Sequence, residues 1–230
     1  MTAVTSMSTG RAAAAILRKE IRAELRGREL LNTTFIFAMV VVVLFSFAFE
    51  PTVAESRRFG PGLLWIDLLF AGSLMLQPSF AREHANDTLD ALCLAPVSGF
   101  AILLGKMLAN FVFLTACEVL LLPVFSVFYN VSLLPVLGKL ILVMILGTMG
   151  LVITGTVFSA IAAQARMREL LLPLLLLPVL VPLLLASVEA TAGLLADTPE
   201  LSRTWLEILI GFDVIFFTAS WLLADFLLQE

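Results

Sequence analysis

The stretch LGKLILVMILGTMGLVITGTVFSAIA, residues 137–162, decides the fold. It carries one charged side chain, Lys139, among residues that are otherwise apolar, small or hydroxyl-bearing. At ~1.5 Å of rise per residue, a helix of this length exceeds the ~30 Å hydrocarbon core of a bilayer. Gly147, Gly150 and Gly155 give it small-residue positions on which a second helix packs closely. The stretch therefore predicts a membrane-spanning helix inside a helical bundle.

The composition of the whole chain agrees with that stretch. Of 230 residues, 60% are hydrophobic and 14% are charged, which is too little charge to cover the surface of a soluble domain. We predict an all-α membrane protein with about six spans in one domain over residues 32–230, after a flexible segment at 1–10. The expected spans are 33–49, 62–80, 103–128, 137–162, 170–188 and 205–228. This arrangement leaves no room for a further soluble domain.

The pattern of residues 11–31 predicts an amphipathic helix ahead of the first span. Leu17, Ile21 and Leu25 repeat at four-residue spacing, and basic side chains occupy the other faces. Such a helix lies in the headgroup plane with its cations facing anionic lipid. We expect an interfacial elbow helix here.

The positions of Lys and Arg predict the orientation. With the N-terminus in the cytoplasm, ten of the 14 Lys and Arg residues fall on the cytoplasmic side. The other four, Arg57, Arg58, Lys139 and Arg203, fall outside. Six spans then return the C-terminus to the cytoplasm. We further expect Trp65, Tyr129 and Trp205 to form part of an aromatic belt at the outer interface.

The segment 81–99, AREHANDTLDALCLAPVSG, is the longest polar stretch between two spans. Residues 87–95 favour a short helix ended by Pro96, and its leucines need an apolar partner. One interpretation is a cytoplasmic coupling element that docks on an ATP-hydrolysing subunit; the other is an ordinary amphipathic connection lying on lipid. The residues expected to make the docking contact are Glu83, Asp87, Leu89, Asp90 and Leu92.

Three carboxylates fall well inside predicted spans, away from the span ends: Asp67, Glu118 and Asp213. Helical rise places all three in the outer half of the bilayer. An ionised carboxylate there is costly, so such residues face the bundle interior, pair or stay protonated. They form either a polar seam that opens outward or receives a partner helix, or three neutral carboxyls bonded to hydroxyls or backbone. The hydroxyls in reach are those of Ser73, Thr115 and Thr218.

The sequence does not provide the residues that several other functions require. The nearest approach to a phosphate-binding loop runs from Gly99 to Gly105-Lys106, with one residue too many and Met107 where Ser or Thr is needed. The single histidine, His84, gives neither a hydrolase triad nor a metal cluster, and we expect it to be a solvated loop residue rather than a haem ligand. The basic N-terminal helix is too short for a nucleic-acid groove. We therefore predict a non-catalytic subunit without catalytic or metal-binding residues.

Two long segments resemble one known family. Residues 80–131, FAREHANDTLDALCLAPVSGFAILLGKMLANFVFLTACEVLLLPVFSVFYNV, and 168–190, RELLLPLLLLPVLVPLLLASVEA, closely resemble cytochrome c maturation protein B, also called haem exporter protein B. The parts of the resemblance that are most specific to this family are Leu-Ala-Pro-Val, Gly-Lys-x-Leu-Ala-Asn and the spacing from Glu118 to Pro123. Asp87 departs from the family pattern, where a glycine is common.

The resemblance implies a permease of the ABC-2 export type in the bacterial inner membrane, paired with an ATP-binding subunit as a two-plus-two core. It also implies a haem-handling membrane partner, a small single-span protein and a periplasmic haem chaperone. ATP and Mg²⁺ would be bound by the partner subunit and haem handled by the complex, with no cofactor bound by this chain. Two alternatives stay open: an exporter of another amphipathic substrate, and a passive scaffold for the haem-handling partner.

Overall fold

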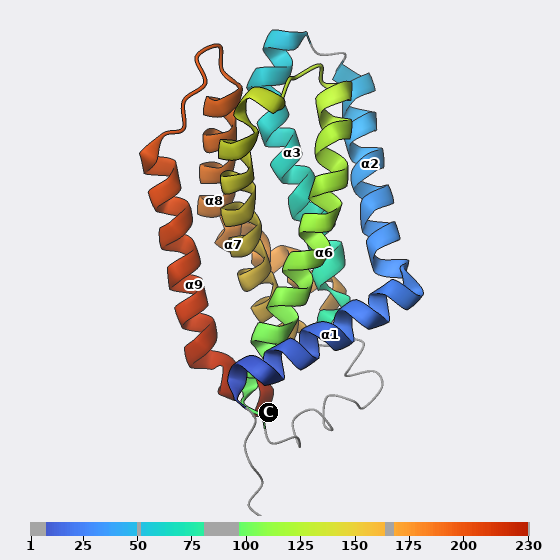
Figure 1. Ribbon diagram of the computed structural model, residues 1–230, viewed down its shortest axis with the longest axis vertical. Helices are drawn as coiled ribbons and strands as arrows, with labels where there is room; N and C mark the ends of the chain where they lie inside the picture. The colour runs from blue at the N-terminus through green and yellow to red at the C-terminus, as the bar shows by residue number, and fades with distance from the viewer. Residues whose placement is uncertain (1–7, 50–51, 81–96, 164–167, 230) are drawn as a thin grey trace, which may run out of the picture.

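The computed structural model describes residues 8–49, 52–80, 97–163 and 168–229. Within them the chain forms a bundle of long helices with one shorter helix laid across an end (Figure 1). The helices are α1 (Thr9–Gly27), α2 (Glu29–Phe49), α3 (Val53–Leu76), α6 (Gly99–Phe128), α7 (Leu137–Ala163), α8 (Arg168–Leu195) and α9 (Arg203–Gln229), with a 3-10 turn at Leu134–Val136.

Six of these helices are long and apolar enough to cross a membrane. That finding confirms the predicted class, an all-helical protein with six spans. Successive spans run in opposite directions, so α1 and the last turns of α9 lie at the same end of the bundle (Figure 1). This end is called the α1 end below, and the other the far end.

The second span begins earlier than the sequence suggested. Residues around Arg57 and Arg58 read as a loop before Pro61, but they belong to α3, which begins at Val53 and contains that proline. A capping box explains the difference: Thr52 accepts from the Glu55 N–H, and the Glu55 carboxylate accepts from the Thr52 N–H. The cap satisfies the first turn, so the helix starts two turns before the apolar pattern does.

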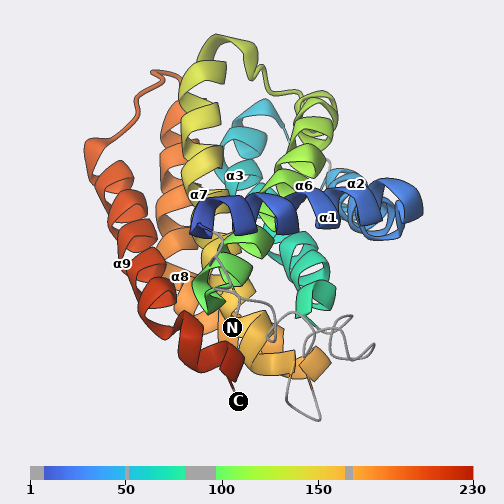
Figure 2. The same cartoon turned by 60° about the horizontal axis from the view of Figure 1, so that its bottom comes forward.

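The helix α1 lies across the bundle and packs on α6 (Figure 2). Ala13 and Ile16 are buried there, and a Cβ atom added at Gly105 of α6 would come within 2.7 Å of the Ile16 Cβ. Gly105 is therefore what allows the two helices to cross so closely. Leu25, at the end of the predicted apolar stripe, is 60% exposed and lies away from this contact.

The elbow between α1 and α2 explains why Leu25 turns outward. Arg28 adopts a left-handed conformation at φ 54°, which ends α1. Glu24 is buried instead, and its carboxylate accepts the Leu31 N–H at 2.9 Å, satisfying a donor in the first turn of α2. The expected single helix over 11–31 is thus two helices with a sharp turn at Arg28.

The most buried spans are α3 and α7, with 67% and 56% of their apolar windows inside the bundle, against 22% for α2 and α9. Glycines make the α3–α7 contact close: a Cβ atom at Gly147 would meet the Trp65 ring at 2.2 Å. Trp65 is 1% exposed and donates to Thr191 Oγ1 at 2.9 Å. The expected place of Trp65 in an interfacial belt is therefore wrong, because its indole fills the notch that Gly147 leaves.

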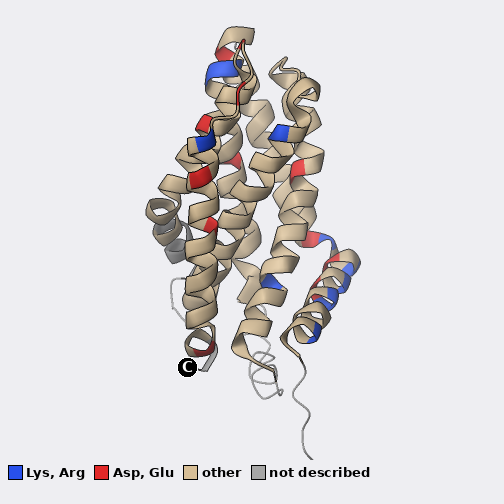
Figure 3. Cartoon of the chain, turned by 60° about the vertical axis from the view of Figure 1, so that its left-hand side comes forward, with Lys and Arg blue, Asp and Glu red and all other residues tan. Residues whose placement is uncertain are grey.

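Lys and Arg gather along α1, and a smaller group lies near the far end (Figure 3). At the far end Arg57 forms an ion pair with Asp197, in the connection between α8 and α9. Arg203 pairs with Glu207 one turn later at 2.6 Å. The described basic residues are thus distributed between the two ends as the orientation argument requires.

Candidate functional site

The five residues predicted to dock on an ATP-hydrolysing subunit, Glu83, Asp87, Leu89, Asp90 and Leu92, lie outside the described residues, as do His84 and Cys93. Both chain segments that flank them are described. The described chain stops at Phe80 and resumes at Val97. The site is therefore built from these two flanks and from what holds them.

The first flank is held by Lys106, a residue of α6 whose side chain is 1% exposed. Its ammonium lies 3.3 Å from Glu20 Oε1 on α1 and donates to the carbonyl oxygen of Ser79. It also sits 4.8 Å from the centre of the Phe80 ring. A buried ammonium requires such partners. One lysine thus joins α1, α6 and the end of the second span.

Asn110 lies one turn beyond Lys106 on the same face of α6. Its amide nitrogen donates to Ser79 Oγ at 3.1 Å and to Thr156 Oγ1 on α7 at 3.0 Å. Both N–H groups of the amide are therefore used. Ser159, also on α7, donates to the Leu76 carbonyl oxygen at 2.8 Å, which satisfies an acceptor at the end of α3. The exit of the second span is tied to α6 and α7.

The second flank is held by α9. Ser98 caps α6 by accepting from the Ala101 N–H, and the Gly99 N–H donates to Asp225 Oδ1 at 2.9 Å. A Cβ atom at Gly99 would lie 2.8 Å from the Ala224 carbonyl oxygen. Glycine is therefore required where the chain re-enters the bundle against α9.

These contacts form what we call the α1-end network, made of Glu20, Ser79, Asn110, Thr156, Lys106 and the Gly99–Asp225 pair. It joins α1, α3, α6, α7 and α9 around the two flanks of segment 81–96. Each tie is directional and the ammonium of the cationic one is buried, so both flanks are fixed to several spans. The side chains of the network are engaged with one another and with backbone groups, so its evident role is to hold the two flanks in place.

Sequence reasoning missed most of this network. Lys106 entered as a charge in the orientation count, in the rejected phosphate-loop match and, with Asn110, in the Gly-Lys-x-Leu-Ala-Asn part of the resemblance, but neither was predicted to hold a flank, and Glu20 was not singled out. A signal was available, since Lys106 and Asn110 stand four residues apart on one face of an otherwise apolar span. Their partners come from remote segments, which spacing along the chain does not reveal.

The three intramembrane carboxylates are all placed in the bundle, but they are not joined to one another by any hydrogen bond among the described residues. Glu118 accepts from Thr148 of α7. Asp213 approaches α7 at Gly150, where a Cβ atom would lie 2.7 Å from its Oδ1. Positions 148 and 150 are about 200° apart around a helix, so Glu118 and Asp213 reach α7 at similar depth from different sides.

Asp67 is 1% exposed, and neither of its carboxylate oxygens has a hydrogen-bond partner in the described part of the chain. None of the three hydroxyls expected as partners of these carboxyls bonds to one of them in the described part of the chain, and Thr115 Oγ1 has no partner there. Ser73 donates to the Leu69 carbonyl and Thr218 to the Val214 carbonyl, each four residues back along its own helix. The polar-seam hypothesis stays a prediction, with Thr148 as a partner that the sequence did not suggest.

A cavity of about 350 Å³ opens beside Asp213 between α6, α7 and α9, with Met107, Phe111, Met149 and Phe217 among its walls. One buried Asp213 oxygen has no hydrogen-bond partner among the described residues. No cluster of three or more His, Cys, Asp or Glu residues suited to a metal ion occurs in that same part of the chain.

Six spanning helices, with an amphipathic helix and a polar network at one end, define a multi-pass helical membrane protein. The sequence profile described as CcmB protein matches residues 11–226, nearly the whole chain. The chain therefore belongs to the CcmB protein family, as the resemblance of residues 80–131 predicted.

Several curated relatives carry the name Heme exporter protein B. That of Bradyrhizobium diazoefficiens is 30% identical over 186 residues, covering 80% of this chain and 82% of the relative. That of Rhodobacter capsulatus is 31% identical over 189 residues, covering 80% and 86%. That of Pseudomonas aeruginosa is 29% identical over 187 residues, covering 80% and 82%. The similarity thus extends over most of both chains.

Proposed function

We propose that this chain is the membrane subunit of an ATP-driven complex for cytochrome c maturation, and that it converts motion of a partner ATPase into motion of its spans. Membership of the CcmB family and the names of the relatives support the class of complex. The observation that carries the mechanism is that both flanks of segment 81–96 are tied to several spans by the α1-end network.

In this proposal an ATP-binding subunit docks on Glu83, Asp87, Leu89, Asp90 and Leu92. Two copies of each subunit form the core, and the partner supplies the site for ATP and Mg²⁺. Closure of the partner around nucleotide displaces the docked segment. Lys106 and Asp225 then pass the displacement to α1, α3 and α9 because each holds a flank directly.

Haem is handled by the complex and not held by a resident site in this chain. A haem-handling membrane protein, a small single-span protein and a periplasmic haem chaperone complete the assembly. The motion of the spans serves either haem export or the release of the loaded chaperone, and both uses require the same coupling.

The docking step is tested by co-purification with the ATP-binding subunit. The double substitution Leu89→Asp and Leu92→Asp removes the apolar contact, and we expect the subunit to be lost from the purified complex. Leu134→Asp is the matched control, because Leu134 is 81% exposed at the far end. Full recovery of the ATPase with the double variant would refute docking on this segment.

The orientation is tested with the two native cysteines. Cys117 is 3% exposed inside the bundle, so a thiol reagent confined to one side of the membrane reports on Cys93. We expect Cys93 to react with an impermeant maleimide only in inverted vesicles, where the cytoplasmic face is outside. Reaction in intact spheroplasts, abolished by Cys93→Ser, would place segment 81–99 in the periplasm.

An ATP-binding subunit that cannot hydrolyse ATP distinguishes the proposed active role of this chain from that of a passive scaffold. The proposal requires that a complex with such a subunit assembles but fails to mature cytochrome c. Normal cytochrome c maturation by that complex would refute the active role and support the passive scaffold. Hydrolysis stimulated by another amphipath, and not by the loaded chaperone, would favour an exporter of a different substrate.

A further inference from the structure

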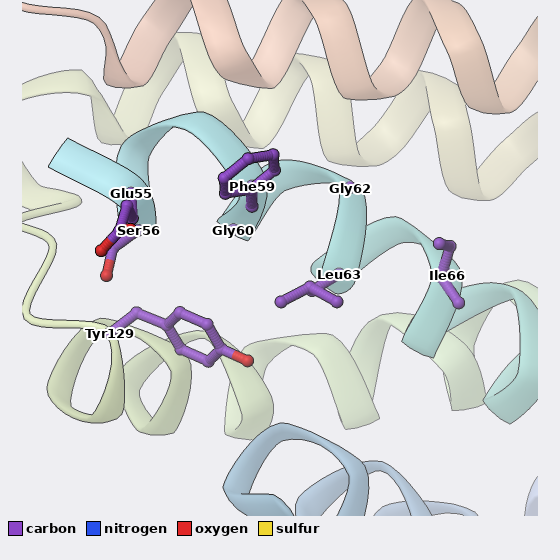
Figure 4. Close-up of a pocket in the computed structure, with 8 residues that line it drawn as sticks. All are labelled: Glu55, Ser56, Phe59, Gly60, Gly62, Leu63, Ile66 and Tyr129. Carbon is purple, nitrogen blue, oxygen red and sulfur yellow. The ribbon is translucent and has the colours of Figure 1, made fainter. Parts of the chain in front are cut away.

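A second cavity, of about 400 Å³, follows the first turns of α3 near the far end (Figure 4). Its walls are apolar, with Phe59, Leu63 and Ile66 along α3, and Gly60 and Gly62 leave the room between them. Phe59 and Ile66 are 57% and 46% exposed on the outer surface of the bundle. The cavity lies in a spanning helix, so its open side faces lipid.

The cavity is elongated along the helix axis. Its lining residues run from Glu55 to Ile66 (Figure 4), a rise of about 16 Å at ~1.5 Å per residue. Half of the ~30 Å hydrocarbon core is about 15 Å. The length therefore matches one acyl chain of one leaflet better than it matches a compact, rounded ligand.

The end of the cavity nearest the membrane surface is polar. Ser56 is 1% exposed, lines the cavity, and its hydroxyl has no hydrogen-bond partner among the described residues. Tyr129 lies across the cavity from Ser56 (Figure 4) and is fixed by stacking on Phe125, with ring centres 4.6 Å apart. A buried hydroxyl without a partner is costly, so a ligand that bonds to it here gains directly.

Opposite charges flank this polar end. Glu55 uses Oε2 to accept from the Thr52 N–H and hydroxyl, and its side chain lines the cavity. The Arg58 guanidinium lies 5.2 Å from the centre of the ring of Phe59, which lines the cavity. In the described part of the chain neither residue takes part in an ion pair within 4.0 Å. An acid and a base three residues apart suit a zwitterion better than a simple anion.

We propose that this cavity binds a phosphatidylethanolamine molecule of the adjacent leaflet. One acyl chain lies along α3 over Gly60 and Gly62. The phosphate is held by Arg58 and the Ser56 hydroxyl, and the ammonium is held by Glu55. The lipid would fix the start of α3, which the Arg57–Asp197 pair ties to the α8–α9 connection. The site is independent of the coupling mechanism.

The proposal is tested by native mass spectrometry of the full chain, released from nanodiscs with equal phosphatidylethanolamine and phosphatidylglycerol. Gly62→Leu fills the cavity, because a Cβ atom at Gly62 meets nothing within 4 Å. We expect retained phosphatidylethanolamine to fall by about tenfold or more, corresponding to ~1.4 kcal/mol. Gly211→Leu, at an equally open position on α9, is the control and should retain the lipid.

Two charge substitutions test the headgroup without filling the cavity. Glu55→Gln keeps the capping box, because glutamine caps as glutamate does, and should shift retention from phosphatidylethanolamine toward phosphatidylglycerol. Arg58→Gln should reduce retention of both lipids. Equal retention by Gly62→Leu and the wild-type chain, equal loss in Gly211→Leu, or lipid selectivity unchanged in both charge variants would overturn the assignment.

Discussion

The α1 end and the middle of the bundle both bury polar side chains, but they use them differently. At the α1 end the ammonium of Lys106 and the amide of Asn110 bond to groups on other elements. In the middle, Asp67 and one oxygen of Asp213 lack partners among the described residues, and packing against small residues holds the helices together. Directional bonds between elements hold the α1 end, and close packing against small residues dominates in the middle.

Because of this difference, substitutions in the two regions should have different effects. A substitution that adds volume at a close contact in the middle, such as Gly147, should disturb packing and hence folding, because that contact is steric. A substitution at the α1 end should leave the bundle assembled while breaking the link between segment 81–96 and the spans. The predictions below test that separation, beginning with the largest effect.

Gly147→Leu should have the largest effect. Any Cβ atom at this position meets the Trp65 ring at 2.2 Å and Ser187 Oγ at 2.8 Å, and overpacking of this kind costs about 1–3 kcal/mol or more. We expect loss of the monodisperse protein in size-exclusion chromatography. Gly138→Leu on the same helix is the control, because its Cβ atom meets nothing within 4 Å. Similar behaviour of the two variants would contradict the packing.

Lys106→Met should impair activity more than stability. It removes hydrogen bonds to a carboxylate and a carbonyl, a cost of about 1–3 kcal/mol, while keeping the buried stem. We expect the complex to assemble and hydrolyse ATP while cytochrome c maturation falls sharply. Lys139→Met, exposed at the far end, should leave both rates unchanged. If the Lys106→Met complex matures as much cytochrome c per ATP hydrolysed as the unaltered complex, Lys106 does not couple hydrolysis to maturation.

Asp225→Ala should give a similar but weaker defect. It removes the acceptor of the Gly99 N–H, on an exposed side chain where water replaces the lost bond. Asp225→Asn retains an acceptor oxygen and should restore most of the maturation activity. A defect in Asp225→Asn as large as that in Asp225→Ala would indicate that charge, and not the hydrogen bond, matters at this flank.

The combined amide substitutions Asp67→Asn, Glu118→Gln and Asp213→Asn should have the smallest effect on assembly. Each keeps the volume of the side chain, so close packing is preserved. If the carboxylates form a polar seam, maturation should fall while the protein remains folded by thermal denaturation. Full activity of the triple variant would leave them as neutral carboxyls without a role in transport.

The sequence predicted the class of fold and the approximate spans because a bilayer demands long apolar segments whatever their packing. It could not place Trp65, whose burial depends on the notch at Gly147, 82 positions away along the chain. It also gave no sign that Glu24 is buried while Leu25 is exposed, which depends on the elbow at Arg28. The α1-end network was hidden for the same reason: its partners are remote in sequence.

The central claim is that displacement of segment 81–96 reaches the spans through Lys106. It is tested most directly by spin-label distances in the assembled complex, with labels at the exposed positions Leu25 on α1 and Leu222 on α9 in a background lacking Cys93 and Cys117. We expect a non-hydrolysable ATP analogue to change this distance in the otherwise unaltered complex and to leave it unchanged with Lys106→Met. The same nucleotide-dependent change in both complexes would contradict the account.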